Sequence, residues 1–237
     1  DYPLWTAAVN LNRGRAVHYP CGPEQRFIPD PGEIESLITK RTRAIVVINP
    51  NNPTGAVYPR SVLEAIARIA EKYHLLVLAD EIYDQMTYDD AEFTPMATLV
   101  HQTLCGTLSG LSKVYRACGY RVGWAVFSGD VEHSRDYLSA LELLSSLRLC
   151  SNVPGQWAVQ TALGGYQSIR ELMTHGGRLF ESRQAIIEAV QRSRYLQLAT
   201  PMGAMYAFVG VSTDLLPEFD DQQFALDLLE HKHVLVA

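Results

Sequence analysis

The sequence contains no uncharged apolar stretch that approaches the ~20 residues needed to span a bilayer as a helix. It has no run of lysines and arginines, and its net charge of −6 argues against nucleic acid or an anionic membrane surface as the main partner. The first residues show neither the basic start nor the apolar core of a signal peptide. Only 4 cysteines are present, without a Cys-x-x-Cys pair, so we expect reduced thiols in a cytoplasmic protein.

Recognisable metal and phosphate-loop motifs are missing as well. His231 and His233 stand close together, but two histidines without a third ligand are typical of a helix end rather than a metal site. Glycine-rich loops of the dinucleotide-binding or P-loop kind are absent. What is present is an ordinary globular composition, with 47% hydrophobic and 19% charged residues, so we expect a folded protein without a bound metal.

Two apolar runs mark the centre of the expected sheet. Residues 44–48 and 75–79 are continuous and aliphatic, the pattern of strands that are buried on both faces. Between them, Ser61 and Glu64 have the spacing of a capping box and predict the start of a helix. A strand, a helix and a second strand in this order predict a right-handed parallel crossover.

The other elements follow from the same kinds of pattern. They are expected as helices at residues 30–39, 131–149, 153–167, 169–192 and 221–231, and as strands near residues 102–108, 122–127, 196–199, 205–211 and 234–237. This order predicts an α/β fold whose large domain, residues 1–168, has a mostly parallel sheet. Residues 169–193 are expected to form an interdomain helix, and residues 194–237 an incomplete small α+β domain.

Polar motifs follow three of the predicted strands. Asn52 lies in a turn after the first strand, Asp80 and Tyr83 follow the second, and Lys113 follows the third, with Arg121 eight residues later. Each alone has a common structural explanation, as a turn residue, a helix cap or a surface lysine. Because ligands of open α/β sheets bind beyond the carboxyl ends of the strands, we expect these side chains to form one site.

These residue types together suit one cofactor, pyridoxal 5′-phosphate. A lysine amine such as that of Lys113 can form a Schiff base with a carbonyl group. A carboxylate at a strand end, here Asp80, can hold a protonated pyridine nitrogen, which makes the ring an electron sink. The hydroxyl of Tyr83 and the amide of Asn52 can bind a phenolic oxygen, and Arg121 can bind a phosphate ester.

The motifs Asn-Pro-x-Asn-Pro-Thr-Gly, Asp-Glu-x-Tyr, Ser-Lys and Arg-x-Gly-Trp occur in this order. In this the sequence resembles the class I/II (fold type I) pyridoxal-phosphate aminotransferases over essentially its whole length, and most closely their bacterial alanine (glutamate–pyruvate) branch. The resemblance implies transfer of an amino group between L-alanine or glutamate-type amino acids and 2-oxo acids. It also implies a homodimer whose active sites lie at the interface.

The resemblance assigns a role to each of these residues. Lys113 is implied as the catalytic residue, which binds the cofactor covalently and, in its free form, moves a proton between the substrate Cα and the cofactor C4′. Asp80 is implied to hold the pyridinium nitrogen. Tyr83 and Asn52 are implied to bind the ring hydroxyl, and Asn52 also to contact the substrate carboxylate.

The same resemblance extends to the phosphate and to the ring face. Arg121 and Ser112 are implied to bind the phosphate, and Tyr2 to stack on the ring. Family members often carry a phosphate-binding serine three residues before the lysine, where this sequence has Gly110. The alanine branch also has a glycine at this position. Members also begin well before residue 1 and continue past Ala237 to an arginine that binds the substrate carboxylate.

Two alternatives to an active aminotransferase stay open at this point. One is an inert, truncated fragment that binds pyridoxal phosphate, because the carboxylate-binding arginine of the family lies outside the chain. The other is a lyase, decarboxylase or synthase on the same fold, which would share Asp80, Tyr83 and Lys113. Residues 203–206 match a segment of the family's small domain, so that domain begins within the chain.

Overall fold

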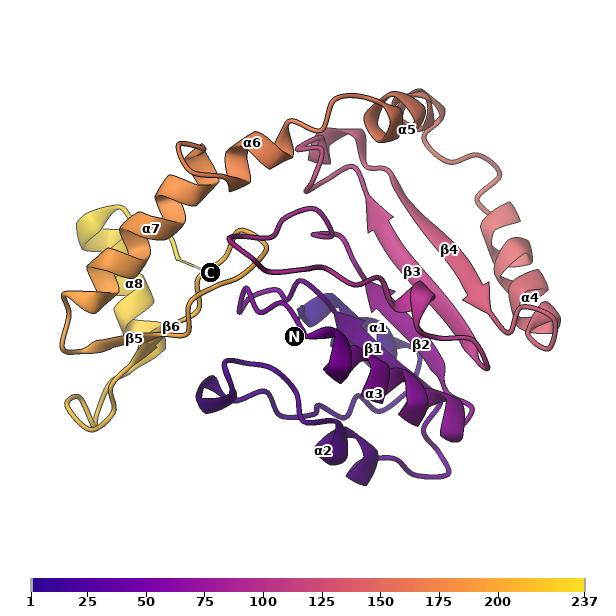
Figure 1. Ribbon diagram of the computed structural model, residues 1–237, viewed down its shortest axis with the longest axis horizontal. Coiled ribbons are helices and arrows are strands. Elements are labelled where there is room, and N and C mark those ends of the chain that lie inside the picture. The colour runs from indigo at the N-terminus through magenta and orange to yellow at the C-terminus, as the bar shows by residue number, and fades with distance from the viewer. Residues whose placement is uncertain (1, 237) are drawn as a thin grey trace.

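A four-stranded sheet forms the centre of the computed structural model, which describes residues 2–236 (Figure 1). Its strands lie side by side in chain order and are β1 (Ala44–Ile48), β2 (Leu76–Asp80), β3 (Leu104–Gly110) and β4 (Gly123–Gly129). β1 pairs with β2, and β2 with β3, in parallel, whereas β4 is antiparallel to β3. The prediction of an α/β fold with a mostly parallel sheet is therefore confirmed.

The crossover helix α3 (Arg60–Lys72) connects β1 to β2 and packs on the sheet (Figure 1). Leu63 and Ile66 of this helix are fully buried in one core with Val47 and Val77 of the strands. Residues three and four apart lie on one face of a helix, so the apolar spacing of the sequence leads directly to this packing. Each buried aliphatic side chain of this kind contributes about 1.5–3 kcal/mol to stability.

The start of α3 differs from the prediction of a capping box. Pro59 is the N-cap residue and no side chain caps the helix, so Ser61 lies inside the first turn. Glu64 pairs instead with Arg60, with 2.7 Å between Arg60 Nε and Glu64 Oε1. The physical reason is that Pro59 has its φ restricted to about −65° and directs the chain into the helix two residues early.

Two helices precede the sheet in the chain. α1 (Pro3–Leu11) was not predicted, and none of its residues is buried, so no apolar stripe marks it in the sequence. α2 (Pro31–Ser36) is shorter than the predicted 30–39. Its N-cap was predicted correctly, because Oδ1 of Asp30 accepts the N–H of Gly32 at 2.7 Å.

The chain after β4 is helical, as predicted. Its helices are α4 (Arg135–Ser146), α5 (Val153–Gly164), α6 (Ile169–Met173) and α7 (Arg178–Gln191), which form an arc beside the sheet (Figure 1). The single helix expected over 169–192 is wrong, because residues 174–177 interrupt it. Gly176 has a φ of +84°, a conformation in which glycine commonly ends helices.

A short antiparallel pair, β5 (Leu196–Leu198) and β6 (Val209–Val211), is followed by α8 (Asp221–Lys232). Both strands are shorter than predicted, and the helix agrees closely with its prediction. Residues 234–236 do not form the expected strand, since the N–H of Val234 bonds to the carbonyl of Leu228 at the end of α8. Residue 237, the last of that prediction, lies outside the described residues.

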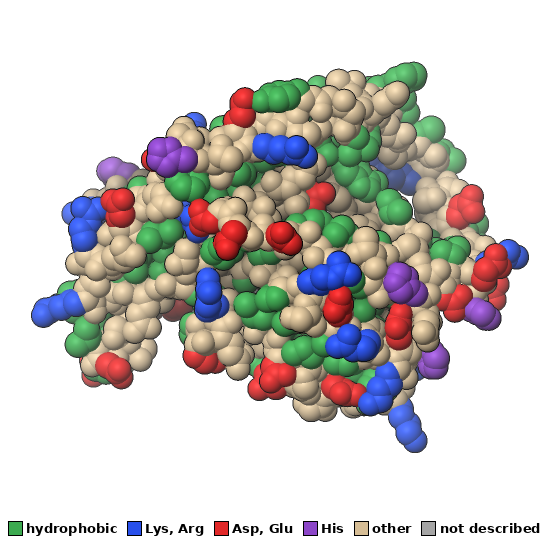
Figure 2. Space-filling view, in the orientation of Figure 1, with side chains coloured by type: hydrophobic (Ala, Val, Ile, Leu, Met, Phe, Trp, Pro, Cys, Tyr) green, Lys and Arg blue, Asp and Glu red, His purple; other side chains and the backbone are tan. Residues whose placement is uncertain are grey.

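Charged side chains of both signs are interspersed on the face drawn in Figure 2, without a broad patch of lysine and arginine. No helix within residues 2–236 is both long and apolar enough to cross a membrane. In the same range, no three His, Cys, Asp or Glu side chains gather in a way that could hold a metal ion. All four cysteines are unpaired.

Candidate active site

The carboxyl ends of β1, β2 and β3 meet at one edge of the sheet. Ile48 is in register with Asp80, and Asp80 with Leu108. Beyond the strands, the N–H of Asn49 donates to the carbonyl of Asp80 at 3.1 Å, and that of Glu81 to Leu108 at 2.9 Å. The segments that follow these strands therefore leave the sheet together, as the sequence predicts.

Asp80, the last residue of β2, is half-buried and accepts a hydrogen bond from far along the chain. The indole Nε1 of Trp5, in α1, donates to its Oδ2 at 3.0 Å. Among the described residues, Asp80 has no other side-chain hydrogen bond and no ion pair, so its second carboxylate oxygen is available to a ligand. Sequence reasoning did not identify Trp5 as a site residue.

Tyr83 is only 1% exposed and its hydroxyl lies 2.7 Å from that of Tyr206. The two rings meet edge to face, with 5.8 Å between their centroids. Burial raises the pKa of Tyr83 far above its usual range, and the hydrogen bond with Tyr206 raises it further. Nearby Asp80 and Tyr2 add to the same effect, so Tyr83 stays protonated at any ordinary pH.

Lys113 faces this tyrosine. Its Nζ lies 5.8 Å from the ring centroid of Tyr83, and within the described part of the chain it forms no ion pair. Its neighbours Leu111 and Val114 are buried, which fixes the turn that follows β3. The structure thus brings Lys113 to Tyr83, which follows Asp80 by three residues at the carboxyl end of β2.

The loop after β1 is held by its own side chains. Oδ1 of Asn51 accepts from the hydroxyl of Thr54 at 2.8 Å, and its Nδ2 donates to the hydroxyl of Tyr58 at 3.2 Å. Gly55 has a φ of +70°, and a Cβ there would come within 2.5 Å of Pro201.

The neighbouring Asn52 side chain has no hydrogen-bond partner among residues 2–236 and is half-buried, so it can bind a ligand.

The predicted phosphate ligands are not brought together by contacts in the described structure. Arg121 is exposed and its Nη1 donates to the carbonyl of Cys118 at 2.6 Å. Neither a hydrogen bond nor an ion pair among the described residues joins Arg121 to Ser112 or to Lys113. The roles of Arg121 and Ser112 therefore remain predictions.

Gly110, which occupies the position of the family's frequent serine, has a structural explanation. It is the last residue of β3 and pairs with Gly123 of β4. A Cβ at Gly110 would lie 2.8 Å from the carbonyl oxygen of Val122 and 3.0 Å from Cα of Gly123. A serine cannot be placed there unless the two strands move apart.

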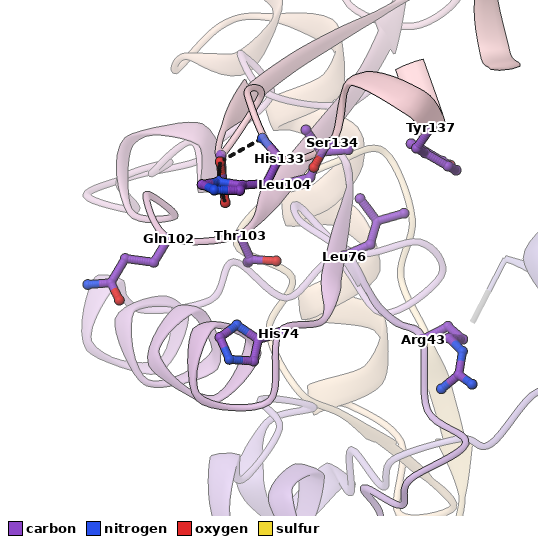
Figure 3. A pocket seen from close by; sticks show the side chains of 10 residues that line it. Arg43, His74, Leu76, Gln102, Thr103, Leu104, His133, Ser134 and Tyr137 are labelled. Atoms are coloured by element: carbon purple, nitrogen blue, oxygen red, sulfur yellow. Dashed lines mark hydrogen bonds and ion pairs between the residues drawn. The ribbon is translucent and has the colours of Figure 1, made fainter. Parts of the chain in front are cut away.

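A separate hollow of about 670 Å³ lies at the opposite edge of the sheet (Figure 3). Leu76 and Leu104, the first residues of β2 and β3, line it together with Arg43 and His74. It therefore contains none of the predicted site residues, which lie at the carboxyl ends of the same strands.

Comparison with known proteins agrees with this geometry. The sequence profile of the family described as "Aminotransferase class I and II" matches residues 1–237. The glutamate-pyruvate aminotransferase AlaA of Escherichia coli (strain K12) is 49% identical over 236 residues, which is 100% of this chain and 58% of that protein. An alanine aminotransferase of Mycobacterium tuberculosis (strain H37Rv) is 47% identical over 100% of this chain and 55% of its own length.

Solved structures show the same similarity. The crystal structure of an aminotransferase from Escherichia coli superposes with a TM-score of 0.95 at 49% identity, covering 99% of this chain and 58% of that one. An alanine aminotransferase from Pyrococcus furiosus superposes with a TM-score of 0.90 at 36% identity, with coverages of 99% and 58%. The chain spans little more than half the length of the relatives it matches, and it belongs to the class I and II aminotransferase family.

Proposed function

We propose that this chain carries the cofactor site of an aminotransferase that moves amino groups between L-alanine or glutamate-type amino acids and 2-oxo acids. The observation that carries this proposal is the meeting of Asp80, Tyr83 and Lys113 at the carboxyl edge of the sheet. The names of relatives that match over the whole chain support the choice of substrates.

The residues present suit pyridoxal phosphate. When bound, this cofactor supplies a carbonyl that accepts an amine and a protonated ring that draws electrons from the substrate. Lys113 would hold it through its amine, which no carboxylate of the described chain neutralises. Asp80 would receive the ring N–H on the oxygen that Trp5 leaves free.

The other residues would orient the cofactor. Tyr83, which its surroundings keep protonated, would donate its O–H to the ring oxygen, and Asn52 would donate its unpartnered amide to the same oxygen or to the substrate carboxylate. Ser112 and Arg121 are proposed for the phosphate, and Tyr2 for the ring face. Once Lys113 is free, its amine is the base that can carry a proton between the substrate Cα and the cofactor C4′.

The alternative functions are less well supported. A lyase or synthase would use the same lysine, aspartate and tyrosine, but the relatives with 45–49% identity over the whole chain are named as aminotransferases. An inert fragment that binds the cofactor would share every contact described above. Only a measurement of amino-acid turnover distinguishes it from the proposed enzyme.

We propose in addition that the protein is a cytoplasmic homodimer. The 4 unpaired cysteines support a reducing compartment. Large apolar side chains at the end of α4 and on α5 support association, because Leu147, the C-cap residue of α4, is 75% and Trp157 77% exposed in the single chain. Exposed large apolar side chains that gather into a patch commonly mark a protein interface.

The test of the proposed activity is the visible spectrum of the protein with pyridoxal phosphate, before and after addition of L-alanine. We expect a band from the lysine-bound cofactor that is lost in Lys113→Ala but retained in Lys40→Ala, an exposed lysine far from the site. L-Alanine should convert the band to that of the aminated cofactor, with release of pyruvate.

Other results would each select an alternative. A band that persists in Lys113→Ala would contradict the assignment of the lysine. A Lys113-dependent band that does not respond to L-alanine or L-glutamate would favour the inert fragment. Consumption of the amino acid without a 2-oxo acid product would favour a lyase.

A further inference from the structure

The hydrogen bond between Trp5 and Asp80 joins residues 75 positions apart and reaches the carboxylate that the proposed function uses. We propose that Trp5 is a positioning residue for Asp80: its indole N–H fixes one carboxylate oxygen so that the other faces the cofactor ring nitrogen. This inference rests on the proposed function, and it adds to that function a residue that does not itself contact the ring nitrogen.

The geometry favours a specific role over general packing. The distance from Trp5 Nε1 to Asp80 Oδ2 is 3.0 Å, within the range of a good hydrogen bond, and both side chains are half-buried. An indole has a single N–H and no acceptor. Trp5 can therefore only donate, and it needs a carboxyl oxygen of Asp80 that carries no proton. A donor to a carboxylate gives a stronger and more directional bond than one between neutral groups.

The bond also attaches α1 to the sheet. None of the residues of α1 is buried, and Leu4 and Leu11 of this helix are 63% and 84% exposed. Within residues 2–236, Trp5 makes the only side-chain hydrogen bond from α1 to a strand of the sheet. The position of α1 against the carboxyl edge therefore depends heavily on this contact.

Anchoring α1 in this way positions a second residue. The N–H of Trp5 donates to the carbonyl of Tyr2 at 3.1 Å in the first turn of the helix. Tyr2 is the N-cap residue of α1 and has an extended backbone, with φ of −73° and ψ of 119°, so this bond fixes it at the point where the chain enters the helix. The electrostatic contribution of Tyr2 to the raised pKa of Tyr83 agrees with this position. Trp5 thus contacts Asp80 through its indole N–H and holds the backbone of Tyr2, the proposed ring-stacking residue, through its main-chain N–H.

A double-mutant cycle on the holoenzyme tests whether Trp5 acts through Asp80. Trp5→Phe keeps an aromatic ring but removes the N–H, Asp80→Ala removes the acceptor, and the double variant combines them. We expect Trp5→Phe to weaken the binding of pyridoxal phosphate about 10-fold, as for loss of a hydrogen bond to a charged group. In the Asp80→Ala background the same change should alter affinity less than about twofold, because the partner is already gone.

Tyr73→Phe is the matched control, because it removes a hydrogen bond to another carboxylate, that of Tyr73 to Oε1 of Glu35 at 3.1 Å, near the amino ends of the strands and away from the site. It should leave cofactor affinity unchanged. Thermal unfolding of each variant without cofactor separates loss of the site from loss of the fold. An affinity for Trp5→Phe equal to that of the wild type, or a Trp5→Phe effect as large in the Asp80→Ala background as alone, would overturn the inference.

A second readout does not need the cofactor. The protein has 3 tryptophans, so the indole N–H resonance of Trp5 can be assigned by its loss in Trp5→Phe. We expect that resonance to shift in Asp80→Ala and to stay in place in Glu92→Gln, and an unchanged resonance in Asp80→Ala would refute the bond. A wild type that binds no cofactor would refute the proposed function, and with it the role at the ring nitrogen, whatever the indole resonance shows.

Discussion

At the scale of single residues, the adjacent carboxylates Asp80 and Glu81 have opposite surroundings. Asp80 is half-buried at the site and accepts the indole N–H of Trp5. Glu81 is 5% exposed, and its single side-chain hydrogen bond within residues 2–236 is from the backbone N–H of Met96, at 2.8 Å. Successive side chains at a strand end point to opposite faces, so one carboxylate lies at the proposed site and the next enters the core. The motif Asp-Glu-x-Tyr therefore combines a proposed site residue with a buried acid.

The buried acid predicts a specific pH dependence of stability. Burial raises the pKa of Glu81 to about 7, and nearby Asp84 and Asp80 add to this shift. An acid whose pKa is higher in the folded state contributes stability that is fully present below its unfolded pKa and is lost as pH rises through about 7. The unfolding free energy of the wild type should thus fall by roughly 2–3 kcal/mol between pH 5 and pH 8 on account of this group.

Glu81→Gln removes the titrating group and keeps an acceptor for Met96. Denaturant unfolding at a series of pH values should show a flatter profile for this variant, which becomes the more stable protein at pH 8. Glu92→Gln, at an exposed position without a hydrogen bond in the described chain, is the control and should follow the wild type. Parallel profiles for Glu81→Gln and the wild type would show that Glu81 stays ionised in the fold.

At the scale of elements, the β3–β4 pair explains a departure from the family pattern. The backbone of β4 approaches β3 so closely at Gly110 that a side chain would meet the carbonyl oxygen of Val122. Gly123 is the partner of Gly110 across the pair and is similarly confined. A Cβ built on Gly123 would lie 3.0 Å from the carbonyl oxygen of Ser109. The two glycines let the strands remain paired up to the turn that carries Lys113.

Gly110→Ala should therefore destabilise the protein by about 1–3 kcal/mol, as expected for overpacking against backbone atoms. Gly119→Ala is a matched control, because no atom lies within 4 Å of the added Cβ, and it should stay within about 0.5 kcal/mol of the wild type. Urea unfolding of the three proteins measures the difference. Equal stability of the two variants would mean that β3 and β4 separate here at little cost.

Elements with a strong local pattern were predictable, and those that depend on backbone detail were not. The apolar run of β1 defined its bounds, and Asp30 identified the start of α2. The start of α3 was misplaced because Pro59, and not the hydroxyl of Ser61, begins the helix. The division of residues 169–192 was missed because helical spacing continues on both sides of Gly176, where the backbone turns left-handed. The proposed domain boundaries were not tested by these elements and stay predictions.

At the scale of the whole molecule, the sequence predicted the part of the site that the sheet topology assembles. Asp80, Tyr83 and Lys113 follow strands whose carboxyl ends coincide, so their motifs alone placed them together. Trp5 and Tyr206 could not be found in this way, because they reach Asp80 and Tyr83 across 75 and 123 residues of chain. Such contacts depend on how α1 and the C-terminal segment pack, which no local pattern encodes.

Exposed apolar side chains at the end of α4 bear on the assembly of the whole molecule. Leu143 and the C-cap residue Leu147 are four residues apart, the spacing of one helix face, and are 67% and 75% exposed in the single chain. If a second copy covers them in the proposed homodimer, a charge placed at Leu143 would be buried without a partner and should weaken association by several kcal/mol.

Sedimentation equilibrium of Leu143→Asp should then show a monomer at concentrations where the wild type is a dimer. Ser145→Asp, on the opposite side of the same helix, adds the same charge and should leave the dimer intact. A dimer that persists in Leu143→Asp would place the interface elsewhere. A monomeric wild type would contradict the homodimer itself, and the exposed leucines would then have to be covered by another part of the protein or by a different partner.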